Sequence, residues 1–284
     1  MPVIDAHTHL APGSPIFNEW AQKTGAKHSL EGLLREMDDN DVERAVVIGH
    51  WVLHEGTRDE PFTNKSNNDL IRFIEQGGDR FRGLLGINIT NEGSLDLELL
   101  DEYLERPEFP GVKFFTGYET YYADDRRLKP VFEVLEKHRA IAMFHTGDTL
   151  LPSGHVRYAH PIPADDVAVA FPGMTVVLAH AGQHWMADAG EVVGKNPNVW
   201  ADISGWFVGR KDLPPHAAFI KHQFQELIYW GVGCEKLMFG SDWPLMAIKP
   251  YIEFVESCDF LSKEEKQMIL YDNAKRLYWG SRKS

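Results

Sequence analysis

Two histidines lie two residues apart at the end of the first apolar segment of the chain. Val3 and Ile4 begin this segment, and His7 and His9 follow. In an extended strand, side chains at positions i and i+2 point to the same face, so both imidazoles would lie side by side. Two neutral imidazoles suit a divalent metal ion such as zinc. Because the chain has 13 histidines, this pair alone is only a weak indication of a metal site.

Later apolar segments carry four more polar residues. In chain order these are Lys113, His145, His180 and Asp242. A single histidine of this kind is more often a hydrogen-bonded core residue or a helix cap than a ligand. Several of them, together with a carboxylate, at the carboxyl ends of neighbouring strands would converge on one rim and favour a metal site.

The segments that carry these residues alternate with segments of helical periodicity. Strands are expected at 3–9, 44–50, 81–89, 111–115, 140–145, 175–180, 198–204 and 236–242. Helices are expected at 30–40, 67–76, 95–104, 128–139, 165–170, 185–194, 217–230, 250–256 and 262–278. The Gly-, Pro- and Asn-rich stretch 11–27 is expected to be a loop.

Eight strands that alternate with helices predict a parallel sheet closed into a single (β/α)8 TIM barrel, with one domain over residues 1–284. A doubly wound open sheet is the alternative fold. It usually carries a glycine-rich phosphate turn after its first strand, whereas here the first strand ends in histidines. In a barrel, the active site lies at the carboxyl ends of the strands, where the polar residues above would meet.

The composition limits the classes of function. At 284 residues, with 43% hydrophobic and 25% charged residues, the chain is an ordinary globular protein with a substantial core. Its net charge of −13 argues against a nucleic-acid partner. Cys234 and Cys258 form no CxxC motif and indicate reduced thiols. Neither a signal peptide nor an apolar run of about 18 residues is visible, so we expect a soluble cytoplasmic protein without a membrane partner.

Four motifs in strand order resemble the amidohydrolase superfamily. They are His-Thr-His on the first strand, Phe-His-Thr-Gly around His145, Ala-His-Ala-Gly around His180 and Phe-Gly-Ser-Asp-Trp-Pro around Asp242. The chain is most similar to the amidohydrolase-related branch, which includes aminocarboxymuconate-semialdehyde decarboxylase and the resorcylate decarboxylases. The closing helix at 271–278 also resembles that branch, so the similarity spans nearly the whole chain.

This resemblance implies that His7, His9, His145 and Asp242 hold one divalent metal ion, preferably zinc, with His180 beside it as a polarising or proton-handling residue. Three neutral nitrogens and one carboxylate leave such an ion with residual positive charge. An open position would then bind water and lower its pKa to about 7. Asp242 would accept the water proton and pass it to a leaving group.

Lys113 has two roles among relatives of this kind. In some members of the superfamily, a lysine on the fourth strand is carboxylated and bridges two metal ions, and the histidine on the sixth strand binds the second. In the nearer branch one ion is expected, and Lys113 would bind an anionic part of the substrate. An ordinary ion pair with a neighbouring carboxylate is a third possibility.

The loops supply further candidates for substrate binding. Trp51, Arg157 and His160 join Lys113 in this group, since an aromatic wall with an arginine would suit a flat carboxylated substrate. Other loop candidates are His50, His54, Tyr118, Tyr121, Tyr122, His155, Tyr158, Trp206 and Arg210. For each of these aromatic residues, packing against the others is an equally supported alternative to substrate binding.

The leading hypothesis is a metal-dependent hydrolase that acts on an amide, lactone or ester-like bond of a small molecule, with Asp242 as proton carrier. The alternative is a metal-dependent, non-oxidative decarboxylase of an aromatic or unsaturated carboxylic acid, in which Asp242 or His180 protonates carbon. A binding or structural protein is least favoured, since an unused cluster of polar groups would have no compensation. The resemblance also implies a homodimer.

Overall fold

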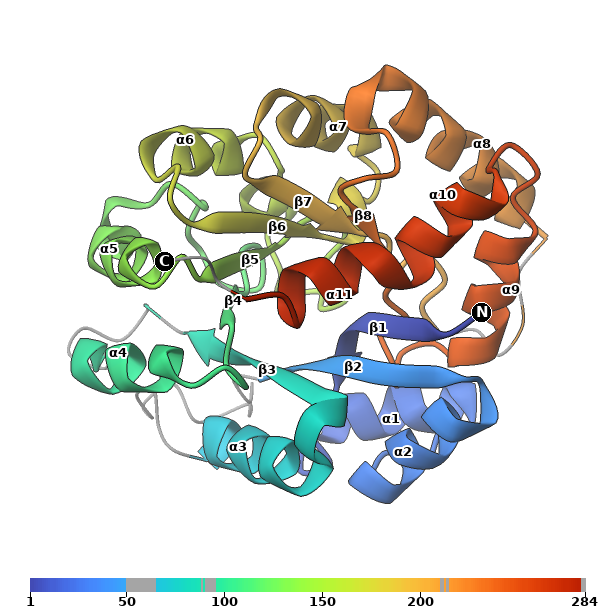
Figure 1. The fold of residues 1–284 in the computed structure, drawn as a ribbon, viewed down its shortest axis with the longest axis horizontal. Helices are drawn as coiled ribbons and strands as arrows, with labels where there is room; N and C mark the ends of the chain where they lie inside the picture. The colour runs from blue at the N-terminus through green and yellow to red at the C-terminus, as the bar shows by residue number, and fades with distance from the viewer. Residues whose placement is uncertain (50–64, 88, 90–95, 210–211, 213–214, 282–284) are drawn as a thin grey trace.

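Eight parallel strands form the centre of the computed structural model, which describes residues 1–49, 65–87, 89, 96–209, 212 and 215–281 (Figure 1). The strands are neighbours in chain order from β1 to β8. Their bounds are β1 Val3–His9, β2 Val42–Ile48, β3 Phe81–Ile87, β4 Gly111–Phe114, β5 Ile141–His145, β6 Thr175–Ala179, β7 Val199–Asp202 and β8 Leu237–Met238.

Helices surround these strands. They are α1 Pro15–Thr24, α2 Leu30–Asp39, α3 Lys65–Gly77, α4 Leu97–Glu105, α5 Lys129–Lys137, α6 Pro163–Ala170, α7 Met186–Lys195, α8 Ala217–Leu227, α9 Ile248–Glu256, α10 Lys263–Gln267 and α11 Asn273–Tyr278. Their apolar faces pack on the outside of the sheet, because both faces of a parallel sheet must be covered. Figure 1 shows this outer ring.

Backbone contacts between the first and last strand regions close the barrel. The amide of Ala6 donates to the carbonyl of Phe239 at 2.9 Å, and the amide of Asp242 donates to the carbonyl of His7 at 2.8 Å. A parallel bridge joins Thr8 to Trp243. The predicted (β/α)8 barrel is therefore confirmed.

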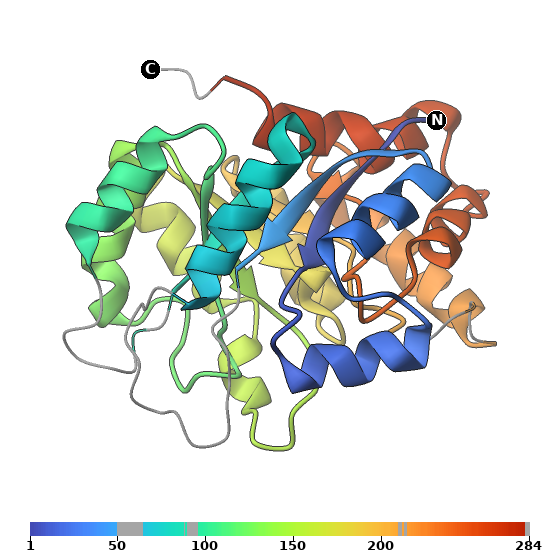
Figure 2. The same cartoon turned by 90° about the horizontal axis from the view of Figure 1, so that it is seen from below.

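One end of the barrel interior is apolar and is closed by the C-terminal helices. The inner layer is formed by Ile4, Ala6, Val46, Ile48, Leu84, Ile141, Met143, Val177, Ala179 and Met238. Tyr271, Ala274 and Tyr278 from the C-terminal helices pack against this layer. Helix α11 lies at the end of the barrel that faces the viewer in Figure 1 and points up in Figure 2. The polar residues are consequently concentrated at the opposite, carboxyl-terminal end.

The predicted loop at 11–27 is wrong over most of its length, because it contains α1. Ser14 has an extended backbone at the N-cap position, and Pro15 occupies the first helical turn, where its fixed φ suits a helix. Gly25 follows the last turn with φ 80°, a left-handed conformation that glycine adopts without strain. The proline and glycine that suggested a loop mark the two ends of this helix.

Strand β8 is shorter than the predicted 236–242. Residues after Met238 leave the regular ladder, and Asp242 has φ 63°. Similarly, the predicted helix 217–230 is α8 up to Leu227, followed by a π-helical turn at Ile228–Val232. Both deviations lie at the ends of correctly predicted elements.

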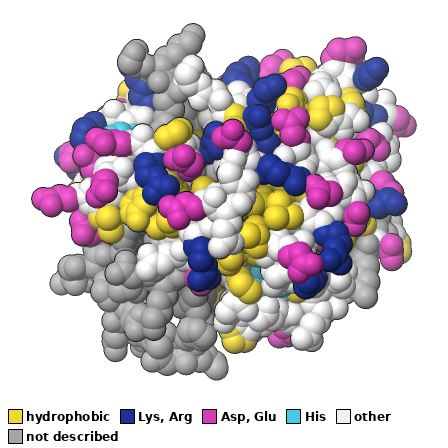
Figure 3. Space-filling model, turned by 60° about the horizontal axis from the view of Figure 1, so that its bottom comes forward, with side chains coloured by type: hydrophobic (Ala, Val, Ile, Leu, Met, Phe, Trp, Pro, Cys, Tyr) yellow, Lys and Arg dark blue, Asp and Glu magenta, His cyan; other side chains and the backbone are white. Residues whose placement is uncertain are grey.

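The surface drawn in Figure 3 is a mixture of charges, with Lys and Arg interspersed among Asp and Glu and small hydrophobic groups between them. None of the helices in the described ranges combines the length and the apolar character needed to cross a membrane.

Candidate active site

An irregularity in β1 sets the direction of its histidines. Asp5 pairs with Ala45 and Thr8 with Val47, so β1 has one residue more than β2 over this interval. Such a bulge locally breaks the strict two-residue alternation of a strand and often re-aims side chains beside active sites. His7, the residue before Thr8, lies within the bulged interval and is fully buried.

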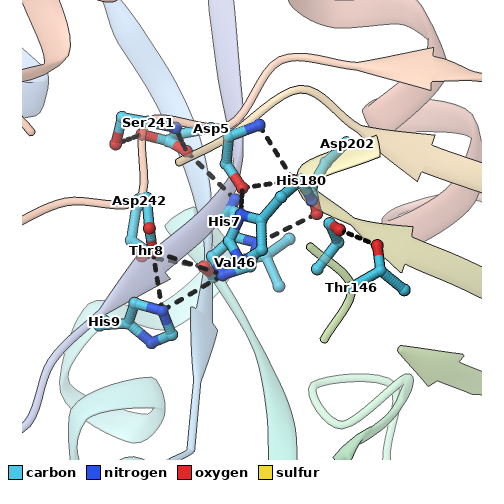
Figure 4. A network of polar contacts seen from close by, with 12 residues as sticks. Asp5, His7, Thr8, His9, Val46, Thr146, His180, Asp202, Ser241 and Asp242 are labelled. Carbon is cyan, nitrogen blue, oxygen red and sulfur yellow. Dashed lines mark hydrogen bonds and ion pairs between the residues drawn. The ribbon is translucent and has the colours of Figure 1, made fainter. Parts of the chain in front are cut away.

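Three ligand atoms converge beyond this bulge (Figure 4). His7 Nε2 lies 3.2 Å from His9 Nε2, and Asp242 Oδ1 lies 2.9 Å from His9 Nε2 and 3.6 Å from His7 Nε2. Bonds of about 2.0–2.1 Å to a tetrahedral zinc ion place its ligand atoms about 3.4 Å apart. Asp242 Oδ1 is also buried and accepts no well-aligned hydrogen bond from the residues that the structure describes. This cluster therefore fits a divalent cation.

The backbone at Asp242 is held in an uncommon conformation. Its φ of 63° lies in the left-handed region, which aspartate and asparagine tolerate better than most residues. His180 has the same φ of 63°. Residues in this region cost of order 1–3 kcal/mol each and cluster at functional sites. Two such residues that border one cavity support the assignment of the site.

Asp202, at the end of β7, orients His7. Its Oδ2 lies 3.0 Å from His7 Nδ1, and both side chains are fully buried. When Nδ1–H donates to this carboxylate, Nε2 keeps its lone pair and points to His9 and Asp242. Carboxylates of this kind fix the tautomer of metal-binding histidines and raise their basicity. Asp202 was not among the residues predicted from sequence, although it is the polar last residue of an apolar strand.

The second oxygen of Asp202 orients His180. Asp202 Oδ1 accepts hydrogen bonds from the amide of His180 at 3.0 Å, from the amide of Ser204 at 3.1 Å and from the Ser204 hydroxyl. Ser204 Oγ also lies 2.8 Å from His180 Nδ1. Because the hydroxyl proton goes to Asp202, His180 Nδ1–H donates to Ser204. His180 Nε2 is therefore the nitrogen with a lone pair.

We expect Asp202→Asn to weaken metal binding and activity about 10- to 100-fold, the range observed for partners of metal-binding histidines. The amide would still fill the space but would no longer stabilise the required His7 tautomer. Ser204→Ala is the matched control, since it removes the link to His180 and leaves the contact between Asp202 and His7. Metal titration of both variants checks this, and equal affinities for wild type and Asp202→Asn would contradict it.

Asp5 joins the first and last strands beside the cluster. Its carboxylate accepts hydrogen bonds from the amide of His7 at 3.1 Å, the amide of Ser241 at 2.9 Å and the hydroxyl of Ser241 at 2.6 Å. Burial raises the pKa of Asp5 to about 7, against the lowering effect of these bonds. Asp5 was not predicted from sequence. It fixes the backbone next to His7 and Asp242.

His145 faces the same cavity from β5 but lies outside the tight group formed by His7, His9 and Asp242. Its ring centroid is 4.9 Å from that of His180, and its Nε2 lies 2.8 Å from the carbonyl of Asp148. Burial and the charge of Lys113 lower the pKa of His145 to about 3, so its ring is neutral. Nδ1 is then the nitrogen with which His145 could bind a metal ion.

Lys113 projects its amine into the same cavity from β4. The side chain is 1% exposed, and Nζ has no hydrogen-bond partner among the described residues. Burial lowers the pKa of Lys113 to about 8, against the attraction of Asp202 and Asp242. Burial likewise raises the pKa of Asp242 to about 7, against the lowering effect of Lys113. Lys113 is thus a buried cation available to an anionic ligand.

The cavity above these residues is partly open to solvent. Its polar base includes His9, Lys113, His145, His180 and Asp242. Apolar side chains form much of the remaining wall: Ile16, Phe17, Trp20, Phe115, Leu150, Leu151, Val208 and Leu245. Such a cavity, mostly apolar with a few polar groups, is typical of a small-molecule site.

The predicted substrate residues on the loops are placed differently. The exposed Arg157 donates to the hydroxyl of Tyr158 at 2.5 Å, and His160 lies 3.3 Å from a carboxylate oxygen of Asp188. Neither residue lines the cavity. Tyr118 does line it, with its ring centroid 4.7 Å from that of His145. The predicted Trp51, like His50, His54 and Arg210, lies outside the described residues.

The amidohydrolase family model matches residues 4–279. This chain belongs to the amidohydrolase family. The match confirms the resemblance inferred from the four strand-end motifs. None of the curated proteins matches the amidohydrolase chain.

Solved structures share the barrel. A TIM-barrel protein from Bordetella bronchiseptica matches with TM-score 0.74 and 22% identity, covering 99% of each chain. A dihydroxybenzoic acid decarboxylase from Polaromonas, with bound manganese and the inhibitor 2-nitroresorcinol, matches with TM-score 0.69 and 16% identity, covering 98% of this chain and 97% of the other. A probable 2-pyrone-4,6-dicarboxylic acid hydrolase from Acinetobacter baumannii, with citric acid bound, matches with TM-score 0.68 and 17% identity, covering 98% and 100%. At these identities they show that the amidohydrolase chain shares their fold.

Proposed function

We propose that this amidohydrolase-family protein is a metal-dependent, non-oxidative decarboxylase of a small aromatic or unsaturated carboxylic acid. This reverses the order of the two hypotheses from sequence, in which a hydrolase came first. The decarboxylase from Polaromonas supports the change. The observation that carries the proposal is Lys113, a buried amine without a hydrogen-bond partner among the described residues, in one cavity with the predicted metal ligands His9, His145 and Asp242.

A carboxylate is the natural partner for this lysine. A buried ammonium is costly unless an opposite charge or hydrogen-bond acceptors compensate for its lost hydration. Asp202 is already engaged by His7, His180 and Ser204, so it is not free to pair with Lys113. A substrate carboxylate would satisfy Lys113 and would place the bond to be broken near Asp242 and His180.

The metal ion would be held by His7, His9 and Asp242, with His145 Nδ1 as the fourth ligand. Nitrogen and carboxylate ligands suit zinc, and the relative from Polaromonas carries manganese. Once bound, the ion would supply positive charge that binds substrate oxygen and stabilises developing negative charge. We propose one ion per chain, with an uncarboxylated Lys113. A second ion with carboxylated Lys113 is the alternative.

Residues of the chain itself would bind the substrate and supply the proton that the reaction consumes. Lys113 holds the carboxylate while the carbon–carbon bond breaks, carbon dioxide leaves, and the electron pair of that bond stays on the substrate carbon. Asp242, or His180 at its Nε2, would first take up a proton from solvent and then deliver it to that carbon, where it replaces the carboxyl group. Phe115, Leu150 and Leu151 limit the access of water, which is not a reactant in this step.

Hydrolysis is the second candidate, because the probable hydrolase from Acinetobacter baumannii has the same fold. In that case Asp242 would take a proton from water instead of giving one to carbon. The same residues would act on a lactone, amide or ester-like bond.

A panel of aromatic and unsaturated acids and of lactones tests the proposal, with metal-loaded protein and simultaneous measurement of substrate loss and carbon dioxide. We expect carbon dioxide in a one-to-one ratio with the acid consumed. Lys113→Met should raise KM about 10- to 100-fold, since hydrogen bonds to charged groups contribute about 1.5–3 kcal/mol. The exposed lysine of α9, changed as Lys249→Met, is the control. Consumption of a lactone without carbon dioxide would contradict the proposal.

Two properties of the whole protein belong with this proposal. We propose a homodimer, as the resemblance implies, and a location in the cytoplasm, which reduced thiols at Cys234 and Cys258 favour. Light scattering that gives the mass of a monomer over a wide concentration range would contradict the dimer.

A further inference from the structure

We propose that α1 builds a hydrophobic subsite beside the catalytic group, and that this subsite receives an uncharged apolar substituent of the substrate. The substrate would then be an amphipathic acid, with its carboxylate at Lys113 and an alkyl or aryl group against α1. The position of the carboxylate rests on the proposed function, whereas the apolar subsite stands on the geometry of α1 alone.

One side of α1 forms this wall. Ile16, Phe17 and Trp20 all line the cavity, and their spacing places them on one helical face. Leu150, Leu151, Val208 and Leu245 also line the cavity. An apolar group bound in this cavity would move from water into contact with hydrocarbon side chains.

The wall adjoins the predicted metal cluster. The ring centroid of Phe17 is 5.1 Å from that of His9, whose Nε2 is one of the three converging ligand atoms. A ligand bound at this cluster would therefore contact α1 as soon as it extended beyond its reacting group. The subsite is a continuation of the reaction site and not a separate cavity.

Contacts at both ends of α1 hold the wall in place. At its end, the Thr24 hydroxyl donates to the carbonyl of Pro244 at 2.8 Å, in the loop that follows Asp242. Near its start, His28 Nδ1 lies 2.9 Å from Asn18 Oδ1, and His28 Nε2 accepts from the amide of Ala11 at 3.1 Å. A wall fixed before binding loses little conformational entropy when a ligand arrives.

Several contacts hold the indole of Trp20 in place. A Cβ atom at Gly209, which has φ 74°, would lie 2.6 Å from Trp20 Cζ3, so the indole packs directly on bare backbone. Lys23 Nζ lies 3.9 Å from the centroid of the indole. The amide of Gly209 donates to the carbonyl of Leu245 at 2.7 Å, which ties this backbone to another wall residue. Trp20 is therefore a fixed surface and a good single target for mutation.

Charge is distributed unevenly over the described lining. The cation is Lys113 at the base, whereas Ile16, Phe17 and Trp20 are uncharged. A second carboxylate placed against these three side chains would lose hydration without gaining an opposite charge from them, and Asp148, which also lines the cavity, adds a negative charge. The described wall therefore favours an acid whose far end is apolar.

Calorimetric binding of benzoate, 3-butylbenzoate and 4-butylbenzoate to metal-loaded protein tests this subsite without requiring turnover. We expect the better butyl compound to bind about 10- to 100-fold more tightly than benzoate, since each buried methylene contributes about 0.8 kcal/mol. Trp20→Ala should reduce this ratio to about threefold or less and leave benzoate affinity within about twofold. Ile16→Asn, at a half-buried position, gives a second test if Trp20→Ala does not fold. Trp230→Ala, at a residue 67% exposed, is the control.

Equal binding of benzoate and both butyl compounds, no binding of any of them, or an unchanged ratio in folded Trp20→Ala and Ile16→Asn would overturn the subsite. A Trp20-dependent ratio without decarboxylation of any acid would leave the subsite standing and count against the proposed function. Lys113→Met distinguishes the contribution of the ligand's carboxylate to binding from that of its apolar end. It should weaken benzoate and butylbenzoate equally and keep their ratio.

Discussion

Asp242→Asn is expected to lower turnover by about 10²–10⁴-fold, the usual contribution of a general acid or base, while the protein keeps its fold and part of its metal. The substitution is suited to the site because asparagine tolerates the φ of 63° at this position. The amide oxygen can still coordinate weakly, whereas the amide cannot carry a proton at neutral pH. A bound metal ion would also lower the pKa of Asp242, which burial raises to about 7 against the effect of Lys113.

His180→Asn is the companion variant. His180 is held through its Nδ1 by Ser204, and we place it outside the group that binds a single ion. Turnover should therefore fall while metal content stays nearly unchanged. Metal content and turnover number should be measured on the same preparations of both variants. Near-normal turnover in metal-replete Asp242→Asn would leave that residue as a structural ligand only.

The second large effect is expected from the loss of the β1 histidines. Purified wild-type protein should hold about one divalent ion per chain, as the group of converging ligand atoms from His7, His9 and Asp242 implies. His7→Ala and His145→Ala should each remove most of it, and a variant that lacks both His7 and His9 should retain almost none. Elemental analysis after removal of loosely bound metal measures this directly.

His160→Ala is the matched control, because His160 pairs with Asp188 and does not line the cavity. It should retain the wild-type metal content. Stoichiometric metal in the variant without His7 and His9 would contradict the assignment of the site. A ratio near two, together with a carboxyl group on Lys113, would establish the binuclear alternative.

Much of the site was predictable because several β/α units follow the same pattern, in which a polar residue stands at the end of an apolar segment. His145, His180 and Asp242 each stand out as polar residues at the ends of apolar segments, and a barrel brings such ends to one rim. The same rule applied to β7 would have found Asp202. It was overlooked because a single strand-end aspartate has no motif of its own, and its contact with His7 joins residues 195 positions apart.

The rest of the site depends on details that local patterns do not contain. The composition of residues 11–27 predicts a loop where the structure has α1, because the proline and glycine at the ends of this helix are also turn residues. As a result, Ile16, Phe17 and Trp20 were missing from the predicted lining. Arg157 and His160 were plausible from their residue types alone, but the path of the loop after β5 directs them to Tyr158 and Asp188.

The most direct test of decarboxylation is isotope labelling of the product from the first substrate found, with metal-loaded wild-type protein in D₂O and, separately, in H₂¹⁸O. We expect one deuterium on the carbon that loses the carboxyl group, release of carbon dioxide, and no ¹⁸O in the organic product. A product that carries ¹⁸O from the solvent, with its carboxyl group intact, would contradict decarboxylation and identify a hydrolase.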